Sequence, residues 1–141
     1  MQLIDVVNQW FKKAHDDLKI AFHIFNSMHP KPADTTCFLS QQAAEKALKA
    51  FLLYNDVEAP YTHDLSELCK ACIKINPAFA EYYRDCAPLT RYAVRTRYPE
   101  PDEVCEETAA EALRKAVRVY QFIFDIIPGI DEKYRFDKTT R

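Results

Sequence analysis

Apolar side chains recur with helical spacing over most of this chain. In the first segment they follow one another at intervals of four and three residues, which places them on one face of a helix. The members of this face are Leu3, Val7, Trp10, Ala14, Leu18, Ala21 and Phe25. The pattern predicts a helix from about Ile4 to Met28, with its apolar face turned toward a core.

Prolines divide the rest of the chain. They stand at Pro30, Pro32, Pro60, Pro77, Pro99, Pro101 and Pro128. Between them the apolar periodicity predicts helices over about 35–54, 64–76, 78–93 and 102–127. Pro88 lies inside the fourth of these segments, where it predicts a kink or a short break, because proline removes a backbone hydrogen bond and clashes with the preceding turn.

Composition narrows the fold class. The chain has 141 residues, 48% of them hydrophobic, which suits one folded core, and Gly129 is its one glycine. Tight hairpin turns and phosphate-cradling loops both need glycine, so a β fold, a P-loop and a Rossmann site are all disfavoured. We predict an all-α, up-and-down four-helix bundle with an additional short helix over residues 1–130. A polar C-terminal tail, 131–141, is expected to fray.

Charge and cysteine content bear on partners and location. The formal net charge is -2, so binding to nucleic acid would need a local basic surface. The N-terminus does not resemble a secretion signal, and no apolar run is long enough to span a bilayer. We therefore expect a cytoplasmic protein whose five cysteines are reduced thiols.

The segment 35–54 carries polar side chains where a bundle helix usually has apolar ones. Gln42, Glu45, Lys46 and Lys49 share one face, because they are spaced by three, four and seven residues from the first. A separate apolar face can pack in the core; it comprises Leu39, Ala43, Ala47, Leu48 and Phe51. The polar face is a candidate surface for a ligand or a partner protein.

Three segments together resemble the HEPN domain (higher eukaryotes and prokaryotes nucleotide-binding). They are the Gln-Ala-Ala-Glu-Lys-Ala-Leu-Lys-Ala run at 42–50, Thr-His-Asp-Leu at 62–65, and Thr-Arg-Tyr-Pro at 96–99. The resemblance extends from about Trp10 to Phe124. It implies a helical bundle, usually homodimeric, that binds nucleotide or works beside a minimal nucleotidyltransferase encoded as a separate chain.

Arginines gather in the fourth predicted helix and just after it. Arg84, Arg91 and Arg95 would share a face if that helix were continuous, and Arg97 would lie at its end. Guanidinium groups bind phosphate oxygens well, and the nearby Tyr98 can stack on a base. The same arginines would equally suit salt bridges to Glu45 or to acids of the fifth helix, or a solvated face.

The sequence argues against the usual HEPN ribonuclease chemistry. The resemblance implies that catalytic members carry an arginine followed four to six residues later by a histidine. Here the histidines, His15, His23, His29 and His63, all precede the first arginine, Arg84. We therefore predict a non-catalytic binding module without a cofactor. Two alternatives stay open: an RNA endonuclease toxin with a degenerate site, using His63 or Tyr98 as proton carrier, and a purely structural dimerisation domain.

Two further motifs are interpreted as structural. Asp64 is expected to cap a helix, with Glu67 as its reciprocal partner, while His63 packs or bonds to backbone. Cys69 and Cys72 have the spacing of half a zinc site, but no second pair follows them. Both sulfurs fall on the apolar side of their helix, so no metal site is predicted. The candidate ligand or partner site therefore comprises Gln42, Glu45, Lys46, Lys49, His63, Arg91, Arg95, Arg97 and Tyr98.

Overall fold

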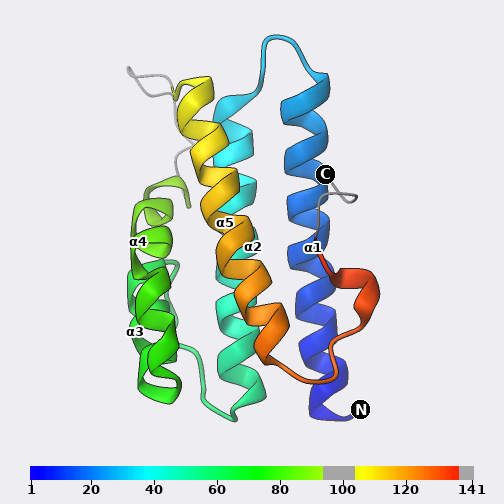
Figure 1. Cartoon of the computed structure of the whole chain (residues 1–141), viewed down its shortest axis with the longest axis vertical. Helices are drawn as coiled ribbons and strands as arrows, with labels where there is room; N and C mark the ends of the chain where they lie inside the picture. Colours follow the sequence, from blue (N-terminus) through cyan, green and yellow to red (C-terminus); the bar gives the residue numbers. More distant parts are fainter. Residues whose placement is uncertain (94–103, 137–141) are drawn as a thin grey trace.

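Three long helices form the body of the molecule. The computed structural model describes residues 1–93 and 104–136, and all the regular structure in these ranges is helical. Helices α1 (Leu3–Ser27), α2 (Ala33–Tyr54) and α5 (Glu106–Ile126) run side by side, with α2 packed against both others (Figure 1). In the described ranges, none of the helices combines the length and hydrophobicity needed to cross a membrane.

The helix bounds match the predicted periodicity closely for the first three helices. The apolar face of α1 buries Val7, Ala14, Leu18 and Ala21, whereas Phe11 takes the buried place expected for Trp10. α2 buries side chains around most of its circumference because it is packed on several sides. The last long helix begins later than expected, at Glu106, directly after Cys105 as its N-cap.

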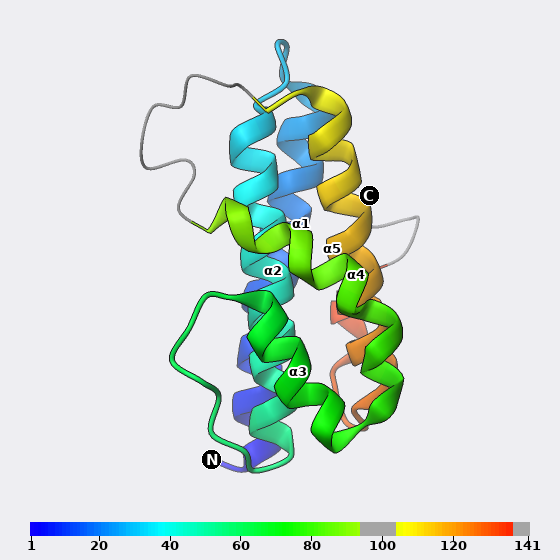
Figure 2. The same cartoon turned by 90° about the vertical axis from the view of Figure 1, so that its left-hand side faces the viewer.

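A second layer lies on the side of α2 and α5 that faces away from α1 (Figures 1 and 2). It begins with α3 (Leu65–Ile75). In place of one long helix that kinks or breaks at Pro88, the chain then forms η1 (Pro77–Tyr82), α4 (Tyr83–Cys86) and η2 (Ala87–Tyr92). Pro77 and Pro88 each lie at the start of a 3-10 segment, where the missing N–H is tolerated. Arg84 and Arg91 therefore lie on two different elements, α4 and η2, and not on the one continuous helix that was predicted; Arg95, the third member of the predicted face, lies outside the described residues.

Phe79 joins the second layer to the three long helices. Its side chain is fully buried. The ring lies 4.5 Å from that of Phe51 on α2 and 4.9 Å from that of Phe122 on α5, measured between centroids. The edge-on geometry with Phe122 is one that aromatic pairs prefer. This contact positions the segments on either side of Phe79, and these segments together with α2 form the candidate site.

The C-terminal segment is not frayed over its described part, contrary to the prediction. Residues 131–136 fold back along α1 and contain a 3-10 turn, η4 (Glu132–Tyr134) (Figure 1). Phe136 is only 2% exposed, and its ring stacks on Phe22 with 5.3 Å between centroids. The Tyr120 hydroxyl donates a hydrogen bond to the backbone carbonyl of Tyr134. Two aromatic residues are too few to produce a periodic pattern, so the sequence did not predict this packing.

Candidate functional site

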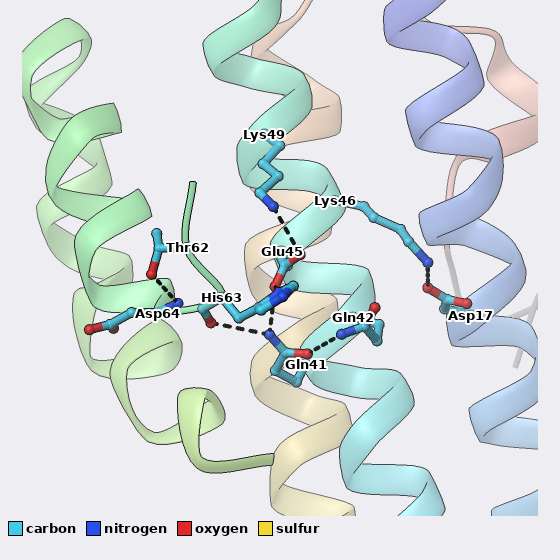
Figure 3. Close-up of polar contacts among 9 residues, drawn as sticks. All are labelled: Asp17, Gln41, Gln42, Glu45, Lys46, Lys49, Thr62, His63 and Asp64. Carbon is cyan, nitrogen blue, oxygen red and sulfur yellow. Dashed lines mark hydrogen bonds and ion pairs between the residues drawn. The ribbon is translucent and has the colours of Figure 1, made fainter. Parts of the chain in front are cut away.

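The polar face of α2 divides between two neighbours (Figure 3). Lys46 reaches toward α1, where its Nζ lies 2.5 Å from an Oδ of Asp17. Burial raises the pKa of Asp17, and the bond to Lys46 opposes that rise. Lys46 is therefore one half of an ion pair between helices. Gln42, Glu45 and Lys49, by contrast, join a network that extends toward the loop before α3.

Glu45 is the centre of that network. Although only 6% exposed, it accepts hydrogen bonds from His63 Nδ1 at 2.8 Å, Gln41 Nε2 at 3.0 Å and Lys49 Nζ at 3.1 Å. Burial raises the pKa of this carboxyl, but the donors His63, Gln41 and Lys49 outweigh burial, so the pKa lies below its ordinary value. The site thus contains a buried carboxylate that stays ionised near neutral pH.

Gln41 belongs to this site, although the sequence analysis did not select it. Its side chain is fully buried on α2. The Gln41 Nε2 also approaches the backbone carbonyl of His63 at 3.4 Å, and its Oε1 accepts from Gln42 Nε2 at 2.6 Å. Gln41 precedes Glu45 by four residues, and side chains at that spacing are neighbours on a helix. That spacing was the one indication of its role in the sequence.

His63 is placed differently from the prediction. Its side chain is 64% exposed, and its Nδ1 is held by Glu45; among the residues that the structure describes, the imidazole neither packs in the core nor bonds to backbone (Figure 3). Asp64 does cap α3, accepting from Ser66 N at 2.9 Å. The Asp64 N–H donates to the Thr62 hydroxyl at 3.0 Å, which is the bond that a capping box would assign to Glu67. A carboxylate-held imidazole with Nε2 toward solvent can bind an anion or move a proton.

A hydrogen-bonded bridge brings the arginine-bearing segment to this histidine. Thr90 Oγ1 accepts from Leu65 N at 3.0 Å and donates to Asp64 Oδ1 at 3.3 Å. Arg91, the next residue, is exposed on η2, and its guanidinium lies over the Tyr92 ring at 5.5 Å. His63 and Arg91 therefore occupy adjoining segments of one surface. Of the other predicted site residues, Arg95, Arg97 and Tyr98 lie outside the described residues.

The cysteines of the second layer face the interior. Cys69 and Cys72 are fully buried, with sulfurs 3.7 Å from the Phe79 carbonyl and 3.8 Å from the Leu48 carbonyl respectively. Burial raises the pKa of the Cys72 thiol beyond the range of a reactive thiol. Across residues 1–93 and 104–136, histidine, cysteine and carboxylate side chains do not gather in groups of three that could hold a metal ion.

Comparisons with known proteins agree with this architecture. The model of the HEPN domain family matches residues 7–127. A protein of Methanocaldococcus jannaschii named "Putative toxin MJ1304" is 30% identical over an alignment that covers 89% of this chain and 88% of that protein. The crystal structure of ST0689, an archaeal HEPN homologue, superposes with a TM-score of 0.66 and 28% identity, covering 84% of this chain and 95% of the other. This chain therefore belongs to the HEPN domain family.

Proposed function

We propose that this HEPN-family chain is a non-catalytic binding module that takes a nucleotide or RNA phosphate at the surface formed by His63 and Arg91. The observation that carries the proposal is the buried Glu45, which holds the exposed imidazole by Nδ1, while the next residue, Asp64, and Leu65 are hydrogen-bonded to Thr90 beside Arg91. An imidazole N–H and a guanidinium fork are both suited to phosphate oxygens. Beneath the surface formed by His63 and Arg91, the negative charge of Glu45 is nearly balanced, because this carboxylate is paired with the Lys49 ammonium.

The chain order of histidines and arginines supports the non-catalytic part of the proposal. An arginine followed four to six residues later by histidine does not occur in this sequence. We further propose, as the HEPN resemblance implies, that the module works beside a minimal nucleotidyltransferase chain. Such an enzyme should be encoded next to this protein and should co-elute with it in gel filtration; separate elution of the two chains would contradict the pairing.

Calorimetric titration of the full chain with ATP, GTP and a short RNA at low salt tests the binding proposal. We expect at least one of them to bind, and Arg91→Ala to weaken that binding by about tenfold, because a charge-assisted bond to phosphate contributes roughly 1.5 kcal/mol. Arg84→Ala is the matched control, since Arg84 is an exposed arginine on α4 and carries the same charge. Absence of binding by all three ligands would remove the basis of the proposal.

A second function, RNA cleavage as a toxin, is favoured by one feature of the site. The Glu45–His63 pair has the arrangement of an oriented general base, and the relative from M. jannaschii carries the name of a toxin. Our proposal requires that RNA stay intact after incubation with the purified protein. Cleavage that persists with a chelator and disappears in His63→Gln would establish the second function in its place.

We also propose that the chain forms a homodimer through the outer face of α1. Leu3 is 43% exposed and Ile20 is 50% exposed, while Val6, Trp10 and Ile24 on the same side are half-buried. Leu3, Val6 and Trp10 follow one another at intervals of three and four residues, and Ile20 and Ile24 lie on the same side of the helix further along, so two apolar patches there are left partly uncovered by other elements. Light scattering should show a dimer for the unmodified protein and a monomer for Ile20→Glu. Lys12→Glu, on the other side of α1, should remain dimeric; a monomeric unmodified protein would exclude this interface.

A further inference from the structure

His15 is buried in an aromatic surrounding that offers little to a charged group. It lies on α1 and is 8% exposed. Ring centroids of Tyr120, Tyr134 and Phe136 lie 6.4, 5.8 and 5.8 Å from its own. The imidazole makes a hydrogen bond to the backbone of Arg135, yet its Nε2 has no hydrogen-bond partner in the part of the chain that the structure describes. A neutral imidazole fits this position, whereas an imidazolium would bury an unpaired N–H.

Residues 131–136, here called the C-terminal strap, cover this histidine. Asn8 Oδ1 on α1 accepts from Asp131 N at 2.8 Å and anchors the start of the strap. At its end, Phe136 N donates to the Gln121 Oε1 of α5 at 3.3 Å. Arg135 pairs with Asp125 of α5 at 3.3 Å. The strap therefore bridges α1 and α5 through both polar and aromatic contacts.

We propose that the C-terminal strap is an acid-released latch, in which protonation of His15 detaches residues 134–136 and uncovers an aromatic surface on α1 and α5. That surface adjoins a groove of about 220 Å³ lined by Phe22, Phe25, Leu113 and Val117. Phe22 belongs to both, because the Phe136 ring stacks on it. Release of the strap would join the covered surface to the groove in one apolar face between the two helices.

The electrostatic surroundings of His15 support this direction of response. Burial lowers the pKa of His15 from its ordinary value of 6.5, and Lys19 lowers it further, whereas Asp16 and the Arg135 backbone act in the opposite sense. Because the pKa is depressed in the closed state, the contribution of His15 to closure is complete above about pH 6.5. It is lost as the pH falls below that value toward the lowered pKa.

The other groups that hold the strap respond elsewhere on the pH scale. Backbone hydrogen bonding from Lys133 lowers the pKa of Asp131, and bonding to Arg135 lowers that of Glu132. Bonding to Glu132 raises the pKa of Arg135, and burial raises that of Tyr120. The two carboxylates, the guanidinium and the phenol therefore keep the same charge between about pH 5 and pH 8, which is the range in which a histidine gains or loses its charge. His15 is thus the sensor in the contact.

Backbone hydrogen exchange of Phe136 in the full chain, followed by NMR from about pH 8 to about pH 5, tests the latch. After correction for intrinsic exchange, protection should be constant above about pH 6.5. Below it, protection should fall about tenfold per pH unit until the lowered pKa is reached. His15→Gln, which keeps a hydrogen-bonding group without the charge change, should hold Phe136 protected throughout.

His23→Gln is the matched control, since His23 is an exposed histidine on the same helix, and it should behave like the unmodified protein. Phe136→Ala provides a second readout that does not depend on position 15: dye binding to the uncovered surface should be high at every pH. The latch is excluded if Phe136 stays protected to about pH 5 in the unmodified protein. It is equally excluded if His15→Gln loses protection over the same pH range.

Discussion

Replacing Phe79 with alanine is expected to lower the free energy of unfolding by about 3–5 kcal/mol, the largest effect of any single substitution considered for this protein. The side chain is fully buried and contacts the rings of Phe51 and Phe122 at 4.5 and 4.9 Å. Truncation removes apolar burial and leaves a cavity between α2, η1 and α5, which proline-rich neighbouring turns cannot easily refill. Urea unfolding followed by circular dichroism measures the change.

Phe79→Leu is the conservative control: it keeps a large apolar side chain and should cost clearly less than the alanine variant if the second layer can repack around it. The alanine variant should also loosen the site, because Phe79 lies between the segments that carry His63 and Arg91. Hydrogen exchange of the Leu65 backbone amide, which donates to the Thr90 hydroxyl, should become faster and thereby report this loosening. A loss below about 1 kcal/mol for Phe79→Ala would mean that the second layer is not held by this aromatic contact.

Replacing Glu45 with leucine is expected to destabilise the protein by about 3 kcal/mol. The substitution leaves Gln41, Lys49 and His63 without their shared acceptor, and Gln41 is fully buried. Glu67→Leu, at an exposed glutamate on α3, is the control and should change stability by less than about 0.5 kcal/mol. Urea unfolding compares the two, and equal small effects would show that the network around Glu45 contributes little.

The same carboxylate predicts a pH dependence of definite sign. Burial acts to raise the pKa of Glu45, but its three donors bring the folded pKa below the ordinary value of 4.5. The stabilisation is therefore present above about pH 4.5 and is lost as the pH falls through the lower folded pKa. Unfolding curves of the unmodified protein and Glu45→Gln should converge as the solution is acidified through this window. A constant gap between them would contradict the assignment.

Local patterns predicted much of the helical structure but not the arrangement of its fourth segment. The apolar face of α1 and the Asp64 cap of α3 depend on neighbours within two turns, so spacing alone was sufficient. Pro88 was correctly expected to disturb its helix. The 3-10 turns on both sides of α4, one beginning at Pro77 and the other containing Pro88, also depend on how the segment packs on α2 and α5.

The candidate site was predicted in its residue types and only partly in its pairings. Glu45 and Lys49 share a helix face, and spacing brought them together correctly. Lys46 lies on the same predicted face, yet it pairs with Asp17 of α1, because the face is divided between α1 and the loop before α3. Nothing in the local sequence around His63 indicates Glu45 as its partner, since eighteen residues separate them.

By itself, the sequence determined the helical class, the bounds of the first three helices and the family resemblance. It also determined that no arginine is followed by the histidine that the resemblance implies for ribonucleases. Each of these depends only on residue type and short-range spacing. Tertiary structure alone decided that His63 is held by Glu45, that Gln41 completes that contact, and that residues 131–136 close over His15. These contacts join segments distant in the chain, and their stability comes from burial and hydrogen bonding that exist only once the helices have packed.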